Sequence, residues 1–189
     1  MLGLLTKISD ESLMLKYQQG DSRSFEKLYA RHKHSLFAYL YRSHVDLSVI
    51  EEIAQETWVA IIDSAKNYRA AAKFKTYLYA IAHRKLVDFW RKNKFDYLVD
   101  RTDGNGESIV KNIADTRSPS ADAIDLSMDL LLALESLSKE QQQAFLLREE
   151  GFSRREIAVM TDTNEETIKS RIRYASTHLK RILEVQYAD

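Results

Sequence analysis

Apolar residues recur at the three- and four-residue spacing of an α-helix through the first half of the chain. Three such stretches begin near Asp21, Ser48 and residue 73, and each carries one apolar stripe that can face a shared core. The stripes comprise Phe25, Leu28, Tyr29, His32, Leu36 and Leu40; Ile50, Ile53, Ala54, Trp58, Ile61 and Ala65; and Phe74, Leu78, Ile81, Ala82 and Phe89. Together with a short helix near residues 10–19, these stretches predict an N-terminal helical bundle.

Residues that favour helix starts and stops indicate where further helices lie. Asp21 is a candidate N-cap, and Ser48 with Glu51 has the spacing of a capping box. The same spacing recurs in Ser138 with Gln141, Ser153 with Glu156, and Thr163 with Glu166. We therefore expect helices to begin at about residues 139, 154 and 164, with Gly151 ending the first of them.

The helical pattern breaks between residues 96 and 118, which include two glycines and several small polar residues. Pro119, the only proline, suits the first position of a helix after this stretch. The sequence therefore predicts an all-α protein with two small helical domains, residues 1–95 and 119–189, joined by a flexible linker over residues 96–118. Within the second domain, a short helix over 154–160, a tight turn and a longer helix describe a helix-turn-helix.

Composition supports this fold class and indicates in which cellular compartment the protein acts. Five glycines and one proline in 189 residues are too few for a β-sandwich, barrel or propeller. Cysteine is absent, which excludes disulfides and Cys-ligated zinc within this chain. The opening MLGLLTKISD has neither the basic start nor the apolar length of a signal peptide, and no apolar run reaches the roughly 18 residues of a membrane helix. We expect a cytoplasmic protein.

Charge is balanced overall but unevenly distributed along the chain. There are 28 basic and 28 acidic side chains, giving a formal net charge of zero. Residues 66–94 nevertheless contain nine basic side chains and one acid, whereas residues 46–63 contain five acids and no lysine or arginine. Such segregation suggests two different partners on two different surfaces.

Three surfaces are candidates for contact with those partners. Outward residues near the start of the last helix can reach base edges in the major groove, although an ordinary bundle also has a solvated helix face. The stripe of small and cationic residues in the 73–92 helix (Thr76, Ala80, Arg84, Val87 and Arg91) can approach a nucleic-acid backbone. Aromatic residues near that stripe can either stack on unpaired bases or fill the core. On the acidic helix, the outward carboxylates surround Val59, which suits either a small docking patch or a single exposed apolar residue.

Catalytic chemistry has little support in the sequence. The five histidines form no ligand cluster, and no nucleophile triad or glycine-rich phosphate loop is present. The clustered carboxylates face outward on one helix without a convergent partner, which argues against a metal-dependent nucleic-acid enzyme. We therefore predict no enzymatic activity, cofactor, metal site or small-molecule substrate.

Four segments, taken in order, resemble the extracytoplasmic-function class of sigma factors of bacterial RNA polymerase. They are SFEKLYARH (24–32), EEIAQETW (51–58), FKTYLYAIAHRKLVDFWRK (74–92) and EGFSRREIAVMTDTNEETIKSRIRYA (150–175). The resemblance implies an alternative sigma factor that binds core polymerase and recognises the minus-ten and minus-thirty-five elements of promoter DNA. It places the promoter-melting region 2 within residues 1–95 and the duplex-reading region 4 within residues 119–189. It also implies an anti-sigma factor as a further partner.

The resemblance assigns residues to each surface. Core polymerase would be bound by Glu52, Gln55, Glu56 and Val59. The minus-ten element would be bound by Asn67, Tyr68, Arg69, Lys73, Thr76, Tyr77, Ala80, Arg84 and Arg91. The minus-thirty-five element would be bound by Glu166, Thr167, Lys169, Ser170, Arg171, Arg173 and Tyr174. The alternative is a stand-alone helix-turn-helix regulator whose N-terminal bundle senses a signal or dimerises.

Overall fold

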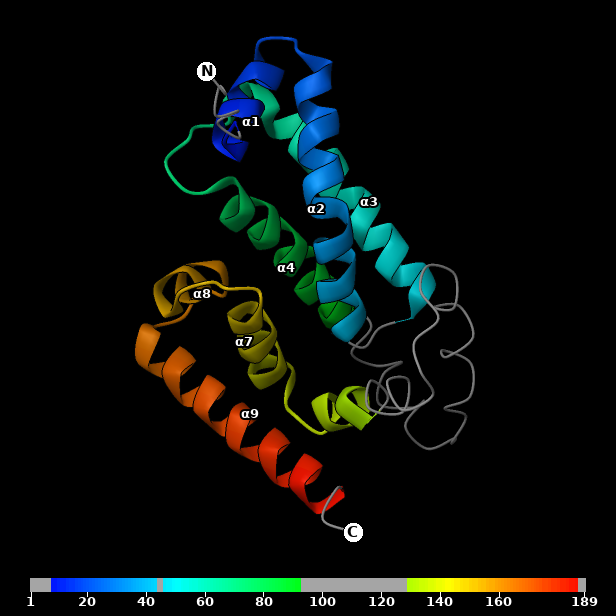
Figure 1. Ribbon diagram of the computed structural model, residues 1–189, viewed down its shortest axis with the longest axis vertical. Helices are drawn as coiled ribbons and strands as arrows, with labels where there is room; N and C mark the ends of the chain where they lie inside the picture. Colours follow the sequence, from blue (N-terminus) through cyan, green and yellow to red (C-terminus); the bar gives the residue numbers. More distant parts are fainter. Residues whose placement is uncertain (1–7, 44–45, 93–128, 187–189) are drawn as a thin grey trace, which may run out of the picture.

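The computed structural model describes residues 8–43, 46–92 and 129–186, and the secondary structure of these residues is helical (Figure 1). An N-terminal group contains α1 (Asp10–Gln18), α2 (Ser22–Arg42), α3 (Leu47–Ser64), the short 3₁₀ helix η1 (Ala65–Asn67) and α4 (Phe74–Lys92). A C-terminal group contains a helical stretch at 129–135, then α7 (Lys139–Glu149), α8 (Arg154–Met160) and α9 (Glu165–Gln186). The all-α prediction is confirmed. The predicted linker over 96–118 and the helix start at Pro119 lie outside the described residues.

Several helices begin where the capping residues predicted. The Asp21 side chain accepts a hydrogen bond from the Arg23 amide (3.1 Å) at the start of α2. Complete capping boxes begin α7 at Ser138 and α8 at Ser153. In each box a hydroxyl and a Gln or Glu side chain satisfy two amides that the first turn leaves unpaired, which explains the sharp starts.

The other two predicted caps were wrong by one or two residues. Helix α3 is capped by Asp46, which accepts from the amide of Ser48 (2.8 Å), so Ser48 lies inside the first turn. At α9, Asn164 accepts from the amide of Thr167 (2.8 Å), and Thr163 precedes the cap. Asp and Asn are at least as good N-caps as Ser and Thr, so the nearby Asp46 and Asn164 compete successfully for these positions.

The N-terminal helices enclose one apolar core, formed largely by the predicted stripes. Its fully buried side chains include Leu28, Leu36, Ile61, Phe74 and Leu78. Tyr29 differs from the prediction because it is 42% exposed, with its ring edge-on to Trp58 at 5.1 Å between centroids. It lies at the margin of the stripe, where α3 covers only one side of the ring.

The C-terminal helices form the predicted helix-turn-helix around a smaller core. Ile168, Ala175 and Leu179 of α9 are buried, and they pack with Leu147 and Ile157. Gly151 has φ of +90°, which allows the chain to reverse after α7, because a left-handed backbone suits glycine. Asp162, between α8 and α9, has φ of +49°, and Asp tolerates this region better than most residues.

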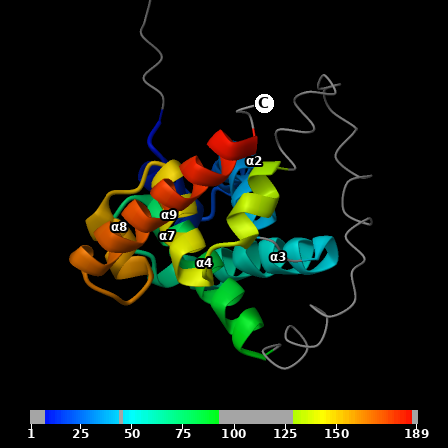
Figure 2. The ribbon, with the colours of Figure 1, turned by 90° about the horizontal axis from the view of Figure 1, so that it is seen from below.

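The two helical groups pack against each other, α8 beside α4 and α7 beside α2 (Figures 1 and 2). The contact is rich in hydrogen bonds. Gln142 donates to the backbone oxygen of Arg42 (3.2 Å), and Gln143 donates to the hydroxyl of Ser43 (2.9 Å). None of the helices in the described ranges is both long enough and apolar enough to cross a membrane.

Candidate protein and nucleic-acid interfaces

The first candidate surface is the acidic face of α3, defined by Glu52, Gln55, Glu56 and Val59. All four side chains are exposed, with Val59 53% exposed, because the opposite side of α3 supplies the core. One carboxylate is already paired, since Glu56 Oε2 lies 2.8 Å from Lys85 Nζ of α4. This pair is exposed enough that it contributes little to stability, so its carboxylate can exchange partners.

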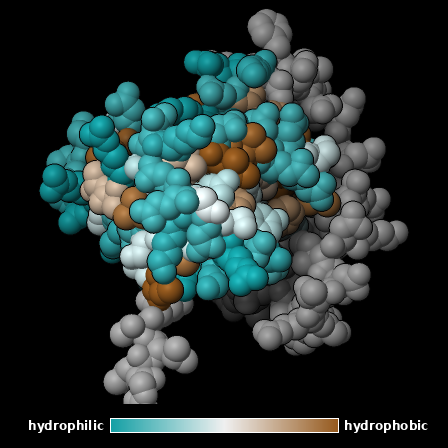
Figure 3. Space-filling model, turned by 90° about the horizontal axis from the view of Figure 1, so that it is seen from above, coloured by the Kyte–Doolittle hydropathy of each residue, from teal (hydrophilic) through white to brown (hydrophobic). Residues whose placement is uncertain are grey.

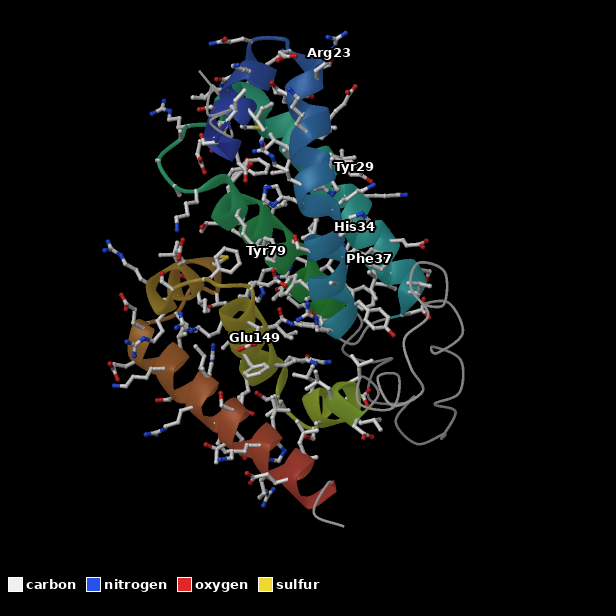
Figure 4. All side chains as sticks on the ribbon, in the orientation of Figure 1. Arg23, Tyr29, His34, Phe37, Tyr79 and Glu149 are labelled. Carbon is white, nitrogen blue, oxygen red and sulfur yellow. The ribbon has the colours of Figure 1, made fainter. Side chains whose placement is uncertain are left out.

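A groove beside the acidic face was missed by sequence reasoning. It lies between α2 and α3 and has a volume of about 530 Å³. Aromatic and apolar side chains supply most of its lining, and Tyr29, His34 and Phe37 of α2 can be followed along it in Figure 4. Val59 and Ile62, three residues apart on α3, complete its rim. That spacing of two outward apolar residues was the signal available in the sequence.

The second candidate surface is the predicted stripe along α4. Arg84 is exposed and the Arg91 side chain is 76% exposed, with Asp88 3.1 Å away on the same helix. Val87 is 40% exposed and Ala80 is half-buried, so small side chains lie beside the two arginines along the stripe. Cations separated by small residues on an open face can contact a phosphate backbone closely.

The segment that joins η1 to α4 divides its predicted residues between surface and core. Asn67, Arg69 and Lys73 are exposed, whereas Tyr68 is only 6% exposed. The Tyr68 ring contacts the rings of Phe74 and Tyr77, and burial raises the pKa of its hydroxyl to about 12. In this conformation the Tyr68 ring is covered and is not open to stacking on a base, and its assignment to the minus-ten element stays a prediction.

The third candidate surface is the outward side of α9. Glu166, Lys169, Ser170, Arg173 and Tyr174 are exposed, while Thr167 and Arg171 are half-buried. Tyr174 stacks on His178 at 6.0 Å, and Lys169 pairs with Glu166 at 3.2 Å. Ser170, Arg171, Arg173 and Tyr174 border a hollow of about 430 Å³. Five of the seven predicted residues are thus exposed together on the helix that a helix-turn-helix inserts into DNA.

The α4 stripe is partly covered by the C-terminal group, which sequence reasoning did not anticipate. The Thr76 hydroxyl donates to Glu156 of α8 (2.9 Å). At the preceding residue, Lys75 Nζ donates to the backbone oxygen of Glu150 (2.6 Å), and the buried Tyr79 hydroxyl donates to the Glu150 carboxylate (2.9 Å). Figure 4 shows Tyr79 on the side of α4 that faces the end of α7.

A larger groove separates the C-terminal half of α4 from the starts of α7 and α9. It has a volume of about 770 Å³, and its lining includes His83, Trp90, Arg91 and Arg171. Burial lowers the pKa of His83, opposed in part by a hydrogen bond with Gln143, so its neutral form is favoured there. Within the described ranges, no group of three or more histidine, aspartate or glutamate side chains is arranged to hold a metal ion.

Comparison with known protein families gives two matches. A model of sigma-70 region 2 matches residues 28–95, and a model of sigma-70 region 4 matches residues 127–179. The first match runs from within α2 to beyond α4, and the second runs from before α7 to within α9.

Curated relatives match over nearly the whole chain. The ECF RNA polymerase sigma-E factor of Haemophilus influenzae is 25% identical over 174 residues, covering 88% of this chain and 90% of that protein. The RNA polymerase sigma-H factor of Pseudomonas aeruginosa is 27% identical over 190 residues, covering 96% of this chain and 97% of that protein.

Two solved structures have the same fold. CnrH in complex with the cytosolic domain of CnrY has a TM-score of 0.70 at 20% identity, covering 94% of this chain and 99% of that chain. The sigma factor RpoE of Bartonella quintana, in complex with the anti-sigma factor NepR, has a TM-score of 0.70 at 22% identity, covering 86% and 98%.

Proposed function

Since the chain belongs to the extracytoplasmic-function class of sigma factors, which direct RNA polymerase to promoters, we propose how its surfaces divide that work. The N-terminal helices, within residues 1–95, bind core polymerase and the minus-ten element. The C-terminal helices, within residues 119–189, bind the minus-thirty-five element. Sigma factors are non-enzymatic regulators, so the proposal assigns no catalytic step to this chain, which acts with polymerase in the cytoplasm.

Core polymerase docks on the acidic face of α3. Exposed carboxylates around the 53% exposed Val59 favour a partner that offers cations around an apolar contact. The groove between α2 and α3 extends this surface with Tyr29 and Phe37, and aromatic residues are enriched in protein interfaces. The acids then supply specificity, while the groove supplies apolar area.

The minus-ten element contacts the α4 stripe and the exposed part of the preceding loop. Arg84 and Arg91 neutralise phosphates, while Asn67, Arg69 and Lys73 surround the unpaired strand. Phosphate contacts of this kind offset the cost of unstacking, a few kcal/mol for each extruded base. Tyr68 supports the loop from the core, since its ring is buried.

The minus-thirty-five element is read as duplex by the exposed side of α9. Lys169, Ser170 and Arg173 lie in its first turns, where a recognition helix contacts base edges. Arg171 is half-buried and borders the hollow, so it suits a phosphate at the groove edge better than a base.

Promoter binding requires the two helical groups to separate at α8. The Thr76 hydroxyl is hydrogen-bonded to Glu156 of α8, and Lys75 is hydrogen-bonded to Glu150 at the end of α7. The C-terminal group and DNA therefore cannot contact this part of α4 at the same time. The described arrangement is thus a closed form. The two solved neighbours in complex with CnrY and NepR support a partner of the anti-sigma class for this chain as well.

The observation that carries the proposal is the exposure of Arg84 and Arg91 on one α4 face together with the separate acidic face of α3. The test is transcription reconstituted from core polymerase, the full chain and promoters of its own genome. We expect sigma-dependent transcripts only when both proteins are present. Tight, specific duplex binding by the chain alone, with no transcript and no binding to core polymerase, would instead identify a stand-alone regulator.

A further inference from the structure

Helix α1 contacts both ends of the segment that joins η1 to α4 (Figure 1). At the near end, Gln18 Nε2 donates to the backbone oxygens of Lys66 (2.8 Å) and Tyr68 (3.3 Å). At the far end, Glu11 Oε1 accepts from the backbone amide of Phe74 (2.8 Å), the first residue of α4. Two side chains from one nine-residue helix therefore fix the points between which this loop runs.

Helix α1 is itself a rigid support for those two side chains. Leu13 and Met14 are fully buried beneath it. The Asp10 carboxylate lies 2.6 Å from Arg31 Nη1 and 2.7 Å from His32 Nε2, both on α2. Burial raises the pKa of Asp10, but hydrogen bonds from Arg31 and His32 outweigh it and bring the pKa below its ordinary value. The ionised carboxylate thus ties α1 to α2.

Between these two points the loop has little support of its own. Residues 69–73 are all exposed, and a short backbone bond from the Ala71 amide to the Arg69 oxygen (2.8 Å) shapes its turn. Three consecutive alanines give the loop no large side chain to bury. Ordering an exposed segment of this kind when a ligand arrives costs conformational entropy, unless its ends are held in place beforehand.

We propose that Gln18 and Glu11 are positioning residues for minus-ten recognition: they fix both ends of the exposed loop, so that Arg69 and Lys73 meet the unpaired strand in a preformed arrangement. This inference rests on the proposed function of that loop. Neither side chain touches the strand. The Gln18 amide acts through the oxygens of Lys66 and Tyr68, and the Glu11 carboxylate acts through the amide of Phe74.

Both residues are half-buried on α1 and bond to backbone atoms rather than to the packed apolar side chains, so their loss is compatible with a folded chain. The end of the molecule formed by α1 and its neighbouring turns is largely hydrophilic (Figure 3), and the Gln18 bond to Lys66 is at the surface. The acidic face of α3 and the outward side of α9 do not include either residue. Substitutions of Glu11 and Gln18 therefore test the positioning role without altering the surfaces proposed for polymerase docking and duplex reading.

The experiment uses holoenzyme formed from the full chain and core polymerase. Its probe is a fluorescent single strand with the minus-ten sequence of a promoter that this chain transcribes, compared with strands in which each base is changed singly. The variants are Gln18→Ala, Glu11→Ala and Glu11→Gln, whose amide oxygen still accepts from Phe74. Matched controls are Gln19→Ala on the same turn and Glu26→Ala on α2, both at exposed positions.

We expect Gln18→Ala and Glu11→Ala each to lower the affinity ratio between correct and altered strands by roughly fivefold, the size of one net hydrogen bond. Glu11→Gln and both controls retain the ratio. The dependence of binding on salt stays unchanged in all variants, because the phosphate contacts of Arg84 and Arg91 remain. Amide hydrogen exchange becomes faster in residues 69–74 alone, which reports a loosened loop in an otherwise intact fold.

Other results would overturn the inference. Unchanged ratios in Gln18→Ala, Glu11→Ala and their double variant would show that loop geometry does not determine base selection. Loss of core binding, or faster exchange throughout α2 and α3, would assign the two residues a general structural role. If wild-type holoenzyme itself shows no base preference in the single strand, the proposed function of the loop fails, and the inference fails with it.

Discussion

Replacing Glu150 by alanine is expected to favour separation of the two helical groups. The Glu150 side chain is 11% exposed and contacts three partners on the N-terminal group. Its carboxylate lies 3.5 Å from Arg42 and 3.4 Å from Lys75, and it accepts from the Tyr79 hydroxyl at 2.9 Å. Alanine removes all three contacts, while the backbone oxygen that accepts from Lys75 remains.

The magnitude follows from how exposed each partner is. Arg42 and Lys75 are 35% and 33% exposed, so water replaces their lost partner and each ion pair is worth well under about 1 kcal/mol. The Tyr79 hydroxyl is buried, and losing a charged acceptor there costs about 1.5–3 kcal/mol. The closed form should lose about 2 kcal/mol, which corresponds to a shift of about thirtyfold in the opening equilibrium.

The assay is single-molecule energy transfer between dyes on the two groups. Because the chain has no cysteine, Glu26→Cys on α2 and Lys180→Cys on α9 give two unique and exposed attachment sites. Glu150→Ala should raise the ratio of open to closed molecules by about thirtyfold. Glu150→Gln should have a smaller effect, since its amide oxygen still accepts from Tyr79.

The matched control is Glu149→Ala, which changes the neighbouring exposed glutamate. Equal open fractions in Glu149→Ala and Glu150→Ala would refute the assignment of Glu150 to the closed form. A melting curve in parallel separates opening from unfolding, because an opened chain keeps the helical signal of both groups.

Three further outcomes are expected. Glu52→Lys combined with Glu56→Lys should weaken binding to core polymerase at least about tenfold in a fluorescence titration. Glu51→Lys, one position outside the acidic face, should not, and equal weakening would locate docking elsewhere. Arg84→Ala should reduce the slope of log affinity against log salt by about 0.7 for single-stranded promoter DNA. An unchanged slope would place Arg84 away from phosphate. Asp10, whose pKa is lowered in the fold by its hydrogen bonds, contributes stability above pH 4 that disappears as the pH falls through its folded value. Asp10→Asn should therefore cost about 1 kcal/mol in urea titrations at pH 7 and progressively less as the pH falls below 4, whereas a constant difference would contradict this linkage.

Much of the fold could be predicted because the information is local. The stripes of α2, α3 and α4 follow from side-chain periodicity, and Ser138 and Ser153 begin helices through partners three residues away. The exact starts of α3 and α9 could not be predicted in this way. In each case two acceptable N-cap residues lie within two positions of each other, and Asp46 and Asn164 are the ones that cap the helices.

Exposure of a candidate surface residue could be predicted where it depends on the residue's position on its own helix. It could not be predicted where it depends on contacts with another part of the fold. Exposure of Arg84 and Arg91 follows from their place opposite Phe74 on α4. Burial of Tyr68 does not, because it requires Phe74 and Tyr77 to cover the ring after the chain has turned. The contacts of Glu150 and Gln18 join residues about 50 to 75 positions apart, and such pairings leave no periodic trace in sequence.

The polar character of the contact between the helical groups has a consequence for the free energy of separating them. Gln142, Gln143, Glu150 and Glu156 all present groups that water can satisfy once the partner helices move away. Phe152, which follows α7, contacts the Tyr79 ring edge-on across the boundary, with 5.0 Å between ring centroids. Because water can hydrogen-bond these groups, separating the two halves costs less free energy than opening a wholly apolar contact, although it also exposes apolar surface that includes the rings of Tyr79 and Phe152.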